Sequence, residues 1–209
     1  MDYHIGAKGN TDMTAADKIS SILKENNGTI TVDMVTSQGL SKTTFYSFVR
    51  EHPLTRADHG IYIDETLWKD DLFILSLRSN KIVFSHETAL YLHGLTDREP
   101  LQLTVTTASG NNLHRIKQSG VKVYNIKPEL LDIGKTVKKT QFGNTVPVYD
   151  LERTICDIVR SRSNIDPQIL QQALKQYVQL KSKDLNKLME YAAKLGIGNI
   201  LRGYLEILL

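Results

Sequence analysis

The segment Leu40–Glu51, Leu-Ser-Lys-Thr-Thr-Phe-Tyr-Ser-Phe-Val-Arg-Glu, decides how the amino-terminal part of this chain folds. If Ser41 caps a helix, then Phe45, Phe48 and Val49 fall at positions i, i+3 and i+4 on one apolar face. The opposite face carries polar, aromatic and basic side chains: Thr43, Tyr46, Ser47 and Arg50. Such a face can donate to phosphates and reach base edges, as a DNA-recognition helix does.

Two helices, the second of them short, are predicted before this segment. Thr14 followed by Asp17 approximates a capping box, and the apolar stripe after it stops at Asn26-Asn27-Gly28. A second helix fits residues 32–38 with Thr31 as its cap, and Gly39 permits the turn that follows. The order of helix, short helix, glycine turn and helix indicates a helix-turn-helix.

A β-hairpin is predicted directly after these helices. Residues 54–57 and 60–63 flank Asp58-His59-Gly60, a turn whose residues tolerate positive φ. A hairpin in this position is a wing, so we expect an α+β protein that opens with a winged helix-turn-helix. The candidate DNA-binding residues are Lys42, Thr43, Tyr46, Ser47 and Arg50 for the major groove, and Arg56 and His59 on the wing. A protein-docking module is the alternative reading of this domain.

The composition is that of a soluble globular protein. Of 209 residues, 41% are hydrophobic and 23% are charged. No apolar run approaches a membrane span, and the first residues lack the apolar middle of a signal peptide. The single Cys156 cannot form an internal disulfide, so a cytoplasmic location is expected. Residues 1–13 carry two glycines and no periodicity, which predicts a flexible tail.

The positive charge is concentrated in the second half of the chain. Residues 1–64 hold six Lys and Arg against eight Asp and Glu, whereas residues 160–209 hold eight against four. Phosphate attraction depends on clustered cations, so the amino-terminal domain alone should bind nucleic acid only modestly. We therefore expect more than one copy on the DNA, or a contribution from the second half.

Residues 67–209 predict a larger domain with a small, mostly antiparallel sheet packed with helices. The expected strands are 101–106, 121–126, 134–142 and 145–149. The expected helices are 70–78, 85–95, 112–117, 150–160, one beginning at Asp166-Pro167, 183–195 and 197–209. Gly196-Ile197-Gly198 is interpreted as the break between the last two helices.

Several segments resemble one known family in the same order. They are Gly39-Leu40-Ser41, Leu54-Thr55-Arg56, Gly60-Ile61-Tyr62-Ile63, Ser85-His86-Glu87-Thr88-Ala89-Leu90-Tyr91-Leu92-His93-Gly94-Leu95 and Val148-Tyr149-Asp150-Leu151-Glu152-Arg153-Thr154-Ile155-Cys156-Asp157-Ile158. Together they are similar to the AbiEi-type antitoxins of bacterial type IV toxin–antitoxin and phage abortive infection systems. The resemblance spans about Thr14 to Leu209, with a winged helix-turn-helix at 14–66 and an antitoxin domain at 67–209.

The resemblance implies both a function and partners. It implies a cytoplasmic antitoxin and transcriptional autorepressor whose winged helix binds inverted repeats in the double-stranded promoter DNA of its own operon. The larger domain would oppose a nucleotidyltransferase-like toxin without forming a stable complex with it. We expect a monomer in solution, more than one copy on DNA, and neither a cofactor nor a membrane as partner.

Two groups of residues invite a catalytic or metal-binding interpretation. His86 and His93 are seven residues apart, about 10 Å along a helix, which is too far for both to bind one zinc ion, and Glu87 between them completes no His-Glu-x-x-His motif. Asp150 and Glu152 stand where a helix start favours carboxylates. Structural roles are therefore favoured for both groups, and no metal site is predicted.

The helix expected to begin at Asp150 contains one ion pair and the single thiol. Arg153 and Asp157 form an ordinary i, i+4 pair, with Leu151, Ile155 and Ile158 expected to face inward. Cys156, between apolar neighbours, is expected to be a buried, inert thiol. Without a catalytic set or a phosphate-binding loop, a binding protein is favoured over the alternative, an enzyme acting on nucleic acid or nucleotides.

The densest group of lysines lies in the second half of the chain. Its members are Lys122, Lys127, Lys135, Lys138 and Lys139. They are interpreted either as a basic patch that contacts DNA or a partner, or as a solvated hairpin face.

Overall fold

The computed structural model describes residues 13–208, and the chain divides into two compact units. The first unit ends at Ile74 and the second begins at Leu75, so the division falls inside helix α4 (Asp71–Arg78) and not at the expected position after residue 66. Of the expected tail, Met13 is exposed and residues 1–12 lie outside the described part. Both units combine helices with a small sheet, as expected for an α+β protein.

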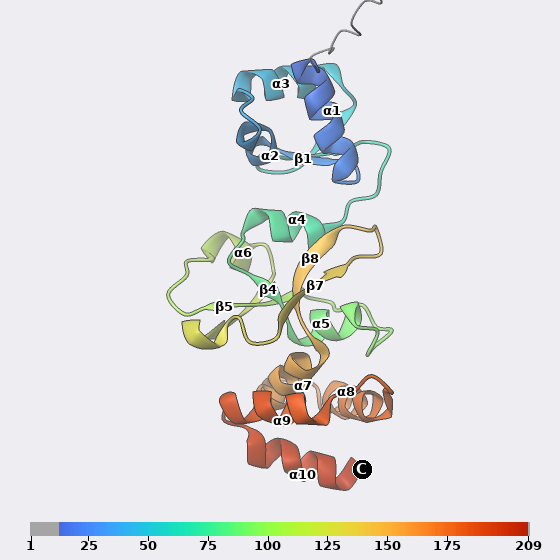
Figure 1. The fold of residues 1–209 in the computed structure, drawn as a ribbon, viewed down its shortest axis with the longest axis vertical. Helices are drawn as coiled ribbons and strands as arrows, with labels where there is room; N and C mark the ends of the chain where they lie inside the picture. Colours follow the sequence, from blue (N-terminus) through green and yellow to red (C-terminus); the bar gives the residue numbers. More distant parts are fainter. Residues whose placement is uncertain (1–12, 209) are drawn as a thin grey trace, which may run out of the picture. The chain divides into compact units, whose positions relative to one another are not determined.

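The first unit contains three helices and three strands (Figure 1). In chain order they are α1 (Ala15–Glu25), β1 (Thr29–Thr31), α2 (Val32–Ser37), α3 (Lys42–Glu51), β2 (Leu54–Asp58) and β3 (Ile61–Asp64). The Thr14–Asp17 capping box is present, Thr31 caps α2 and Ser41 caps α3, so the predicted helix starts are confirmed. Each cap satisfies a backbone N–H that has no partner inside its helix.

The core of the first unit forms where the apolar faces of its helices meet β1 and β3. Its buried side chains are Ile19, Ile30, Val35, Phe45 and Phe48. The Phe45 ring also lies edge-on to the Tyr62 ring, with 5.5 Å between their centres. Because burying a phenylalanine stabilises a fold by about 1.5–3 kcal/mol, the two buried phenylalanines fix the rotation of α3 about its axis. The opposite face of α3 is thereby turned outward.

The three-stranded sheet of the first unit has the order β1-β3-β2, and both of its pairings are antiparallel. The predicted hairpin is confirmed: its register shifts between Arg56 and Asp58, and Gly60 adopts φ +70° in the turn. Strand β1 was missed, because three residues between two helices are too short to show alternation. The pairing of β1 with β3 attaches the hairpin to the helical core.

The second unit is built on a five-stranded mixed sheet. Its strands are β4 (Val83–Phe84), β5 (Thr104–Ala108), β6 (Lys122–Ile126), β7 (Lys135–Lys139) and β8 (Thr145–Tyr149), in the spatial order β6-β5-β4-β8-β7. The pairs β4–β5 and β7–β8 are antiparallel, whereas β5–β6 and β4–β8 are parallel.

This sheet corrects the expectation of a mostly antiparallel one. The two-residue strand β4, which no sequence pattern reveals, lies at its centre and separates β5 from β8. Helix α6 (His114–Gln118) returns the chain so that β6 runs parallel to β5. Strand β5 also begins at Thr104 and not at Leu101, whose side chain is exposed.

The remaining helices pack on the sheet and on one another. They are α5 (His86–Leu92), α7 (Leu151–Arg160), α8 (Pro167–Gln179), α9 (Leu185–Lys194) and α10 (Gly198–Leu208), with single turns η1 (Pro128–Leu130) and η2 (Arg162–Asn164). Figure 1 shows α9 and α10 stacked beyond α7 on one side of the sheet. The break between α9 and α10 is confirmed, with Gly196 at φ +72°. Among helices of residues 13–208, none has the length and apolar character of a membrane span.

Helix α7 is buried on all sides, although one inward face was expected. Every residue from Glu152 to Val159 is buried, because α5, α8 and α9 all pack against this helix. Its apolar side chains join a core cluster that extends through α8, α9 and α10. The polar residues of α7 are therefore interior residues and need partners there.

Candidate functional site

The outer face of α3 carries the predicted recognition side chains. Lys42, Thr43, Tyr46 and Arg50 are exposed and Ser47 is half-buried. Tyr46 keeps 41% of its surface accessible although its ring touches that of Phe45. The Arg50 guanidinium donates to Ser47 Oγ at 3.0 Å, which holds this cation over the middle of the helix. The five side chains thus form one polar, aromatic and basic surface.

The tip of the β2–β3 hairpin carries the other two candidates. Arg56 Nη2 and His59 Nδ1 are 3.0 Å apart, and Arg56 Nε donates to the Asp58 carbonyl at 3.3 Å. With Nδ1 accepting from the guanidinium, the other imidazole nitrogen carries the proton and is free to donate. The structure therefore brings together Arg56 and His59 as a small donor cluster in the same unit as α3.

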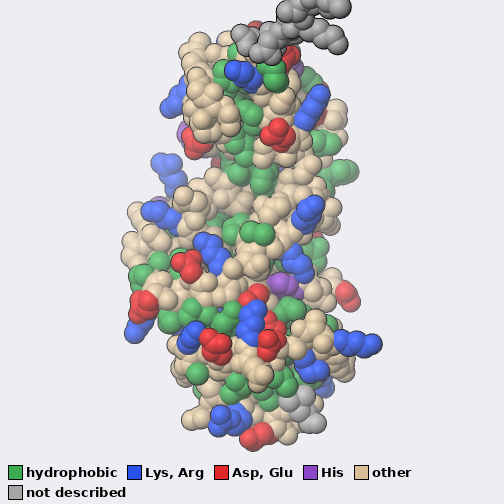
Figure 2. Space-filling model, in the orientation of Figure 1, with side chains coloured by type: hydrophobic (Ala, Val, Ile, Leu, Met, Phe, Trp, Pro, Cys, Tyr) green, Lys and Arg blue, Asp and Glu red, His purple; other side chains and the backbone are tan. Residues whose placement is uncertain are grey.

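The cationic surface is sparse, as the charge count predicts. On the face shown in Figure 2, the Lys and Arg side chains are dispersed over the molecule and do not merge into one basic area. Phosphate attraction grows with the number of cations that can act together. The candidate interface therefore offers several hydrogen-bond donors but little positive charge.

The predicted basic patch is divided by the sheet. Lys122 lies on β6 and Lys127 follows it, whereas Lys135, Lys138 and Lys139 lie on β7, and these strands form opposite edges of the sheet. Four strand spacings separate the edges, which is about 19 Å. The five lysines thus form two groups. They are close in the sequence, but the strand order places them at opposite edges of the sheet.

Three of the five lysines have partners, and they come from both groups. Lys135 Nζ lies 3.5 Å from Asp132, Lys138 Nζ lies 3.2 Å from His93 Nδ1, and Lys122 Nζ lies 4.0 Å from Glu87. Lysines on an edge strand also discourage pairing with another chain, which accounts for part of the β7 group. Lys139 is exposed and forms no ion pair within residues 13–208.

The two histidines of the α5 segment serve the packing of the second unit. His86 Nδ1 lies 2.9 Å from Ser85 Oγ, its Nε2 lies 2.9 Å from Ser161 Oγ, and its ring stacks on Tyr124 with 3.5 Å between centres. His93 Nε2 donates to the Tyr149 carbonyl at 2.7 Å. Ser85 stands at the N-cap position of α5 without a capping hydrogen bond from its side chain, because its hydroxyl bonds His86 and accepts from Thr106.

Burial controls the protonation of His86. It lowers the pKa of this imidazole to about 3, and the positive charges of Lys122 and Arg153 act in the same direction. The backbone of His86 is also in the left-handed region, at φ +48°. His86 is therefore neutral and held in one orientation over the physiological range.

This pKa predicts a loss of stability in mild acid. Below the ordinary pKa of 6.5 the unfolded chain binds a proton at His86, whereas the folded chain does not until about pH 3. Stability therefore falls with decreasing pH, by about 2 kcal/mol at pH 5 from this residue alone. Urea unfolding of the wild type and of His86→Asn at pH 7 and pH 5 checks this, since asparagine tolerates positive φ. An equal pH dependence in both proteins would contradict it.

The carboxylates at the start of α7 are paired with protein donors. Asp150 caps the helix through Arg153 N–H at 2.9 Å, and its other oxygen lies 2.9 Å from Lys187 Nζ. Glu152 accepts from the Tyr177 hydroxyl at 3.1 Å and lies 3.4 Å from Lys187. Within residues 13–208, no three His, Cys, Asp or Glu side chains are grouped so that they could hold a metal ion. These contacts give the two acids a structural role.

The expected i, i+4 pair of Arg153 and Asp157 is present, and both of its side chains are buried. The Arg153 guanidinium bonds Asp157 at 3.1 Å and the carbonyls of Leu130 and Ile133 at 2.9 and 2.7 Å, and it lies 4.1 Å from the Tyr149 ring centre. Arg153 thus fixes the segment between β6 and β7 to α7. Nothing in the i, i+4 spacing distinguishes this pair from a solvated one.

The close approach of this segment to α7 requires a glycine. A Cβ at Gly134 would lie 2.5 Å from Arg153 Cβ, and the backbone there has φ +73°. We expect Gly134→Ala to lower the free energy of unfolding by about 2 kcal/mol or more, measured in urea. Gly120→Ala is the matched control, because Gly120 has φ +85° but open space around it. An equal loss in both variants would show that the contact with Arg153 adds nothing.

The remaining reactive candidate is inert. Cys156 is fully buried, and burial raises the pKa of its thiol to about 12. A nucleophilic or metal-binding thiol needs the opposite shift. The expected buried thiol is confirmed.

Comparisons with known proteins support the fold class. No protein-family model matches the sequence, and no curated protein does. The fold is similar to the crystal structure of the RV2827C protein from Mycobacterium tuberculosis, with a TM-score of 0.54 and 13% sequence identity. The match covers 86% of this chain and 71% of that chain. At this identity the similarity shows the fold alone.

Proposed function

We propose that this protein is a DNA-binding autorepressor and antitoxin of a type IV toxin–antitoxin operon, acting by binding and not by catalysis. The observation that carries the proposal is the outward polar face of α3, followed in the same unit by the β2–β3 hairpin. In this proposal the first unit is a winged helix-turn-helix. The resemblance of the sequence to AbiEi-type antitoxins supplies the operon context.

Helix α3 would enter the major groove. Arg50 and Lys42 can donate to guanine or phosphate, and Tyr46 offers both an apolar edge and a hydroxyl. Ser47 holds the Arg50 guanidinium in place, which reduces the entropy lost when it binds. Arg56 and His59 at the hairpin tip would contact phosphate or the adjacent minor groove.

The few cations predict that a single first unit binds weakly. Inverted repeats would place two molecules side by side on the promoter, and cations of the second unit, such as Lys139, would add phosphate contacts. The proposal therefore assigns specificity to the first unit and part of the affinity to the second unit and to the second copy.

Binding to the operon's own promoter tests the DNA-binding part. The full chain should bind promoter DNA in preference to a scrambled duplex, in a gel-shift assay with competitor. The binding constants of the full chain and of the fragment 1–70 are then measured over a series of salt concentrations. The slope of log K against log salt concentration should be shallower for the fragment, by about 0.9 for each phosphate contact that the fragment lacks. Equal slopes would show that the second unit contributes nothing electrostatic, and no preference for promoter DNA would contradict the autorepressor role.

Co-expression with the neighbouring gene tests the antitoxin part. Residues 67–209 should restore growth in cells that express the toxin if the second unit opposes it. Residues 1–70 should not restore growth, because they carry only the DNA-binding unit. Rescue by the full chain but by neither fragment would show that both units are needed, and a full chain without effect would contradict the antitoxin role.

A further inference from the structure

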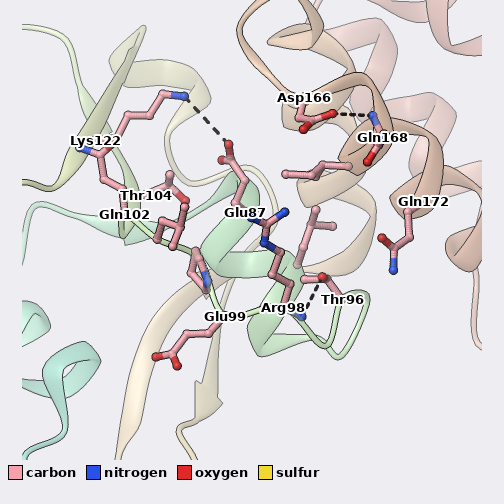
Figure 3. A pocket seen from close by; sticks show the side chains of 14 residues that line it. Glu87, Thr96, Arg98, Glu99, Gln102, Thr104, Lys122, Asp166, Gln168 and Gln172 are labelled. Atoms are coloured by element: carbon pink, nitrogen blue, oxygen red, sulfur yellow. Dashed lines mark hydrogen bonds and ion pairs between the residues drawn. The ribbon is translucent and has the colours of Figure 1, made fainter.

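The proposed function leaves two features of the second unit without a role, a cavity and the open edge of a strand. The cavity has a volume of about 320 Å³ and lies among α5, the segment 96–104 and the start of α8 (Figure 3). Its lining carries charges of both signs, from Arg98, Lys122, Glu87, Glu99 and Asp166, so the charge selects no class of ligand. The edge of β7 presents a more defined set of groups.

Strand β7 forms one edge of the five-stranded sheet, with β8 as its neighbour. At one end of this pairing, Asp150 N–H donates to the Gly134 carbonyl at 2.7 Å. At the other end, Thr140 N–H donates to the Asn144 carbonyl at 2.8 Å. Hydrogen-bonded and non-bonded pairs alternate along an antiparallel ladder, so in this register the even-numbered residues of β7 bond β8 and the odd-numbered residues do not.

The backbone groups of the odd-numbered residues therefore point away from β8. Val137 lies opposite Pro147, which has no N–H to donate, in agreement with this alternation. Lys135 N–H bonds the Asp132 carbonyl at 3.2 Å. Val137 and Lys139 keep outward N–H groups, and all three residues keep outward carbonyls. Within residues 13–208 these groups have no partner, so the edge can accept a further strand.

The side chains of β7 leave this edge accessible. Four of its five residues are exposed, and only Lys138, which contacts His93, is half-buried. Within residues 13–208, β8 is the only helix or strand that packs extensively against β7. Val137, in the middle of the strand, keeps 63% of its surface accessible. Unpaired backbone groups beside an exposed apolar side chain are typical of a strand that pairs with another chain.

The charges at this edge favour an acidic partner. Residues 133–149 contain three lysines and no acidic residue. Of the flanking acids, Asp132 lies 3.5 Å from Lys135 Nζ and offsets one of these charges, whereas Asp150 is paired with Lys187. The edge thus keeps a positive charge, and opposite charges on neighbouring strands attract.

The same charges disfavour a second copy of the sheet. Pairing of β7 with another β7 would place lysine beside lysine in either direction, because Lys135 and Lys139 lie on the same face on the two sides of Val137. The opposite edge strand, β6, lies within residues 121–127, which hold two lysines and no acidic residue. An acidic segment of another protein is therefore the better partner.

We propose that β7 binds an extended acidic protein segment, which joins the sheet as a sixth strand. The segment runs antiparallel to β7, with an apolar side chain beside Val137 and carboxylates beside Lys135 and Lys139. Side chains on one face of a strand alternate, so the segment has the pattern acid-x-apolar-x-acid. The backbone bonds provide affinity and the side chains provide selectivity. The proposal does not depend on DNA binding or antitoxin activity, because it concerns only a surface of the second unit.

A fluorescein-labelled peptide centred on Glu-Thr-Val-Thr-Glu tests the proposal, by fluorescence anisotropy with the full chain. It should bind saturably, and replacing both glutamates by lysines should weaken binding at least about tenfold. N-methylation of the central valine removes an N–H that faces β7 and should also weaken binding at least about tenfold. N-methylation of a neighbouring threonine is the matched control, because that N–H points away from β7 and the affinity should stay within about twofold.

Variants of β7 separate strand pairing from charge. Val137→Pro removes an outward N–H and should leave the sheet intact, because an edge strand tolerates proline where the nitrogen faces solvent. It should weaken binding at least about tenfold, and more than the control Val137→Thr, which keeps the N–H. Lys135→Glu/Lys139→Glu should also weaken binding, whereas Lys175→Glu/Lys181→Glu, at exposed lysines on and just after α8, should have a much smaller effect.

Three results would each overturn the proposal: no saturable binding, equal affinities of the two N-methylated peptides, or equal effects of the two double charge reversals. Displacement of the peptide by an unrelated DNA duplex, with unchanged peptide affinity in Val137→Pro, would also overturn it, because β7 would then attract polyanions by charge alone. The N-methylated peptides are measured on the wild type, so the test holds even if Val137→Pro does not fold.

Discussion

The double variant Arg50→Glu/Arg56→Glu is expected to bind the operon's promoter about 100-fold or more weakly than the wild type. A specific arginine contact contributes about 1–3 kcal/mol, and two contacts are lost on two different elements. The introduced carboxylates also repel the phosphates. Fluorescence anisotropy with labelled promoter DNA at fixed salt measures the effect.

The matched control is Lys18→Glu/Lys24→Glu. These lysines are exposed on α1 of the same unit, so the variant has the same net charge but leaves α3 and the hairpin unchanged. We expect a much smaller loss, arising only from the long-range field. Equal losses would show that net charge, and not this surface, determines binding, and unchanged affinity in Arg50→Glu/Arg56→Glu would place the interface elsewhere.

Arg153→Ala is expected to lower the free energy of unfolding of the second unit by about 3–5 kcal/mol, the usual loss when one partner of a buried ion pair is removed. Asp157 is buried and would lose its cation, and the carbonyls of Leu130 and Ile133 would lose their donor. Burial already raises the pKa of Asp157 against the opposing effect of Arg153. Urea unfolding followed by circular dichroism measures the loss.

An exposed pair with the same spacing is the control. Lys194 and Glu190 are 2.6 Å apart with half or more of each side chain accessible, so Lys194→Ala should cost about 0.5 kcal/mol or less. The double variant Arg153→Met/Asp157→Leu should recover part of the loss, because no unpaired charge remains. Similar losses in Arg153→Ala and Lys194→Ala would contradict the assignment of Arg153 as the residue that holds the β6–β7 segment.

Local patterns were enough to predict most of the elements. The capping residues Thr14, Thr31, Ser41 and Asp150 each start a helix where predicted, because a cap bonds a backbone group only two or three residues away. The β2–β3 and β7–β8 hairpins also follow from neighbouring residues. The outward face of α3 is likewise a consequence of helical spacing.

Contacts between distant segments were not predictable in this way. Strand β4 is only two residues long, yet it lies at the centre of the sheet and thereby places the Lys122 and Lys139 strands at opposite edges. Glu87 lines a cavity only because α5, the segment 96–104 and α8 meet there. Neither the strand order nor the cavity leaves a periodic signal in the sequence.

The sequence by itself thus determined the caps, the turns and the polar face of Leu40–Glu51, because these depend on residues within one or two helical turns. The tertiary structure decided which polar residues are interior. Arg153 and Lys194 stand in the same i, i+4 relation to an acid, but other helices cover α7 whereas the Lys194 side of α9 stays in water. Burial is a property of the packed neighbours, and the same ion pair is structural in one place and marginal in the other.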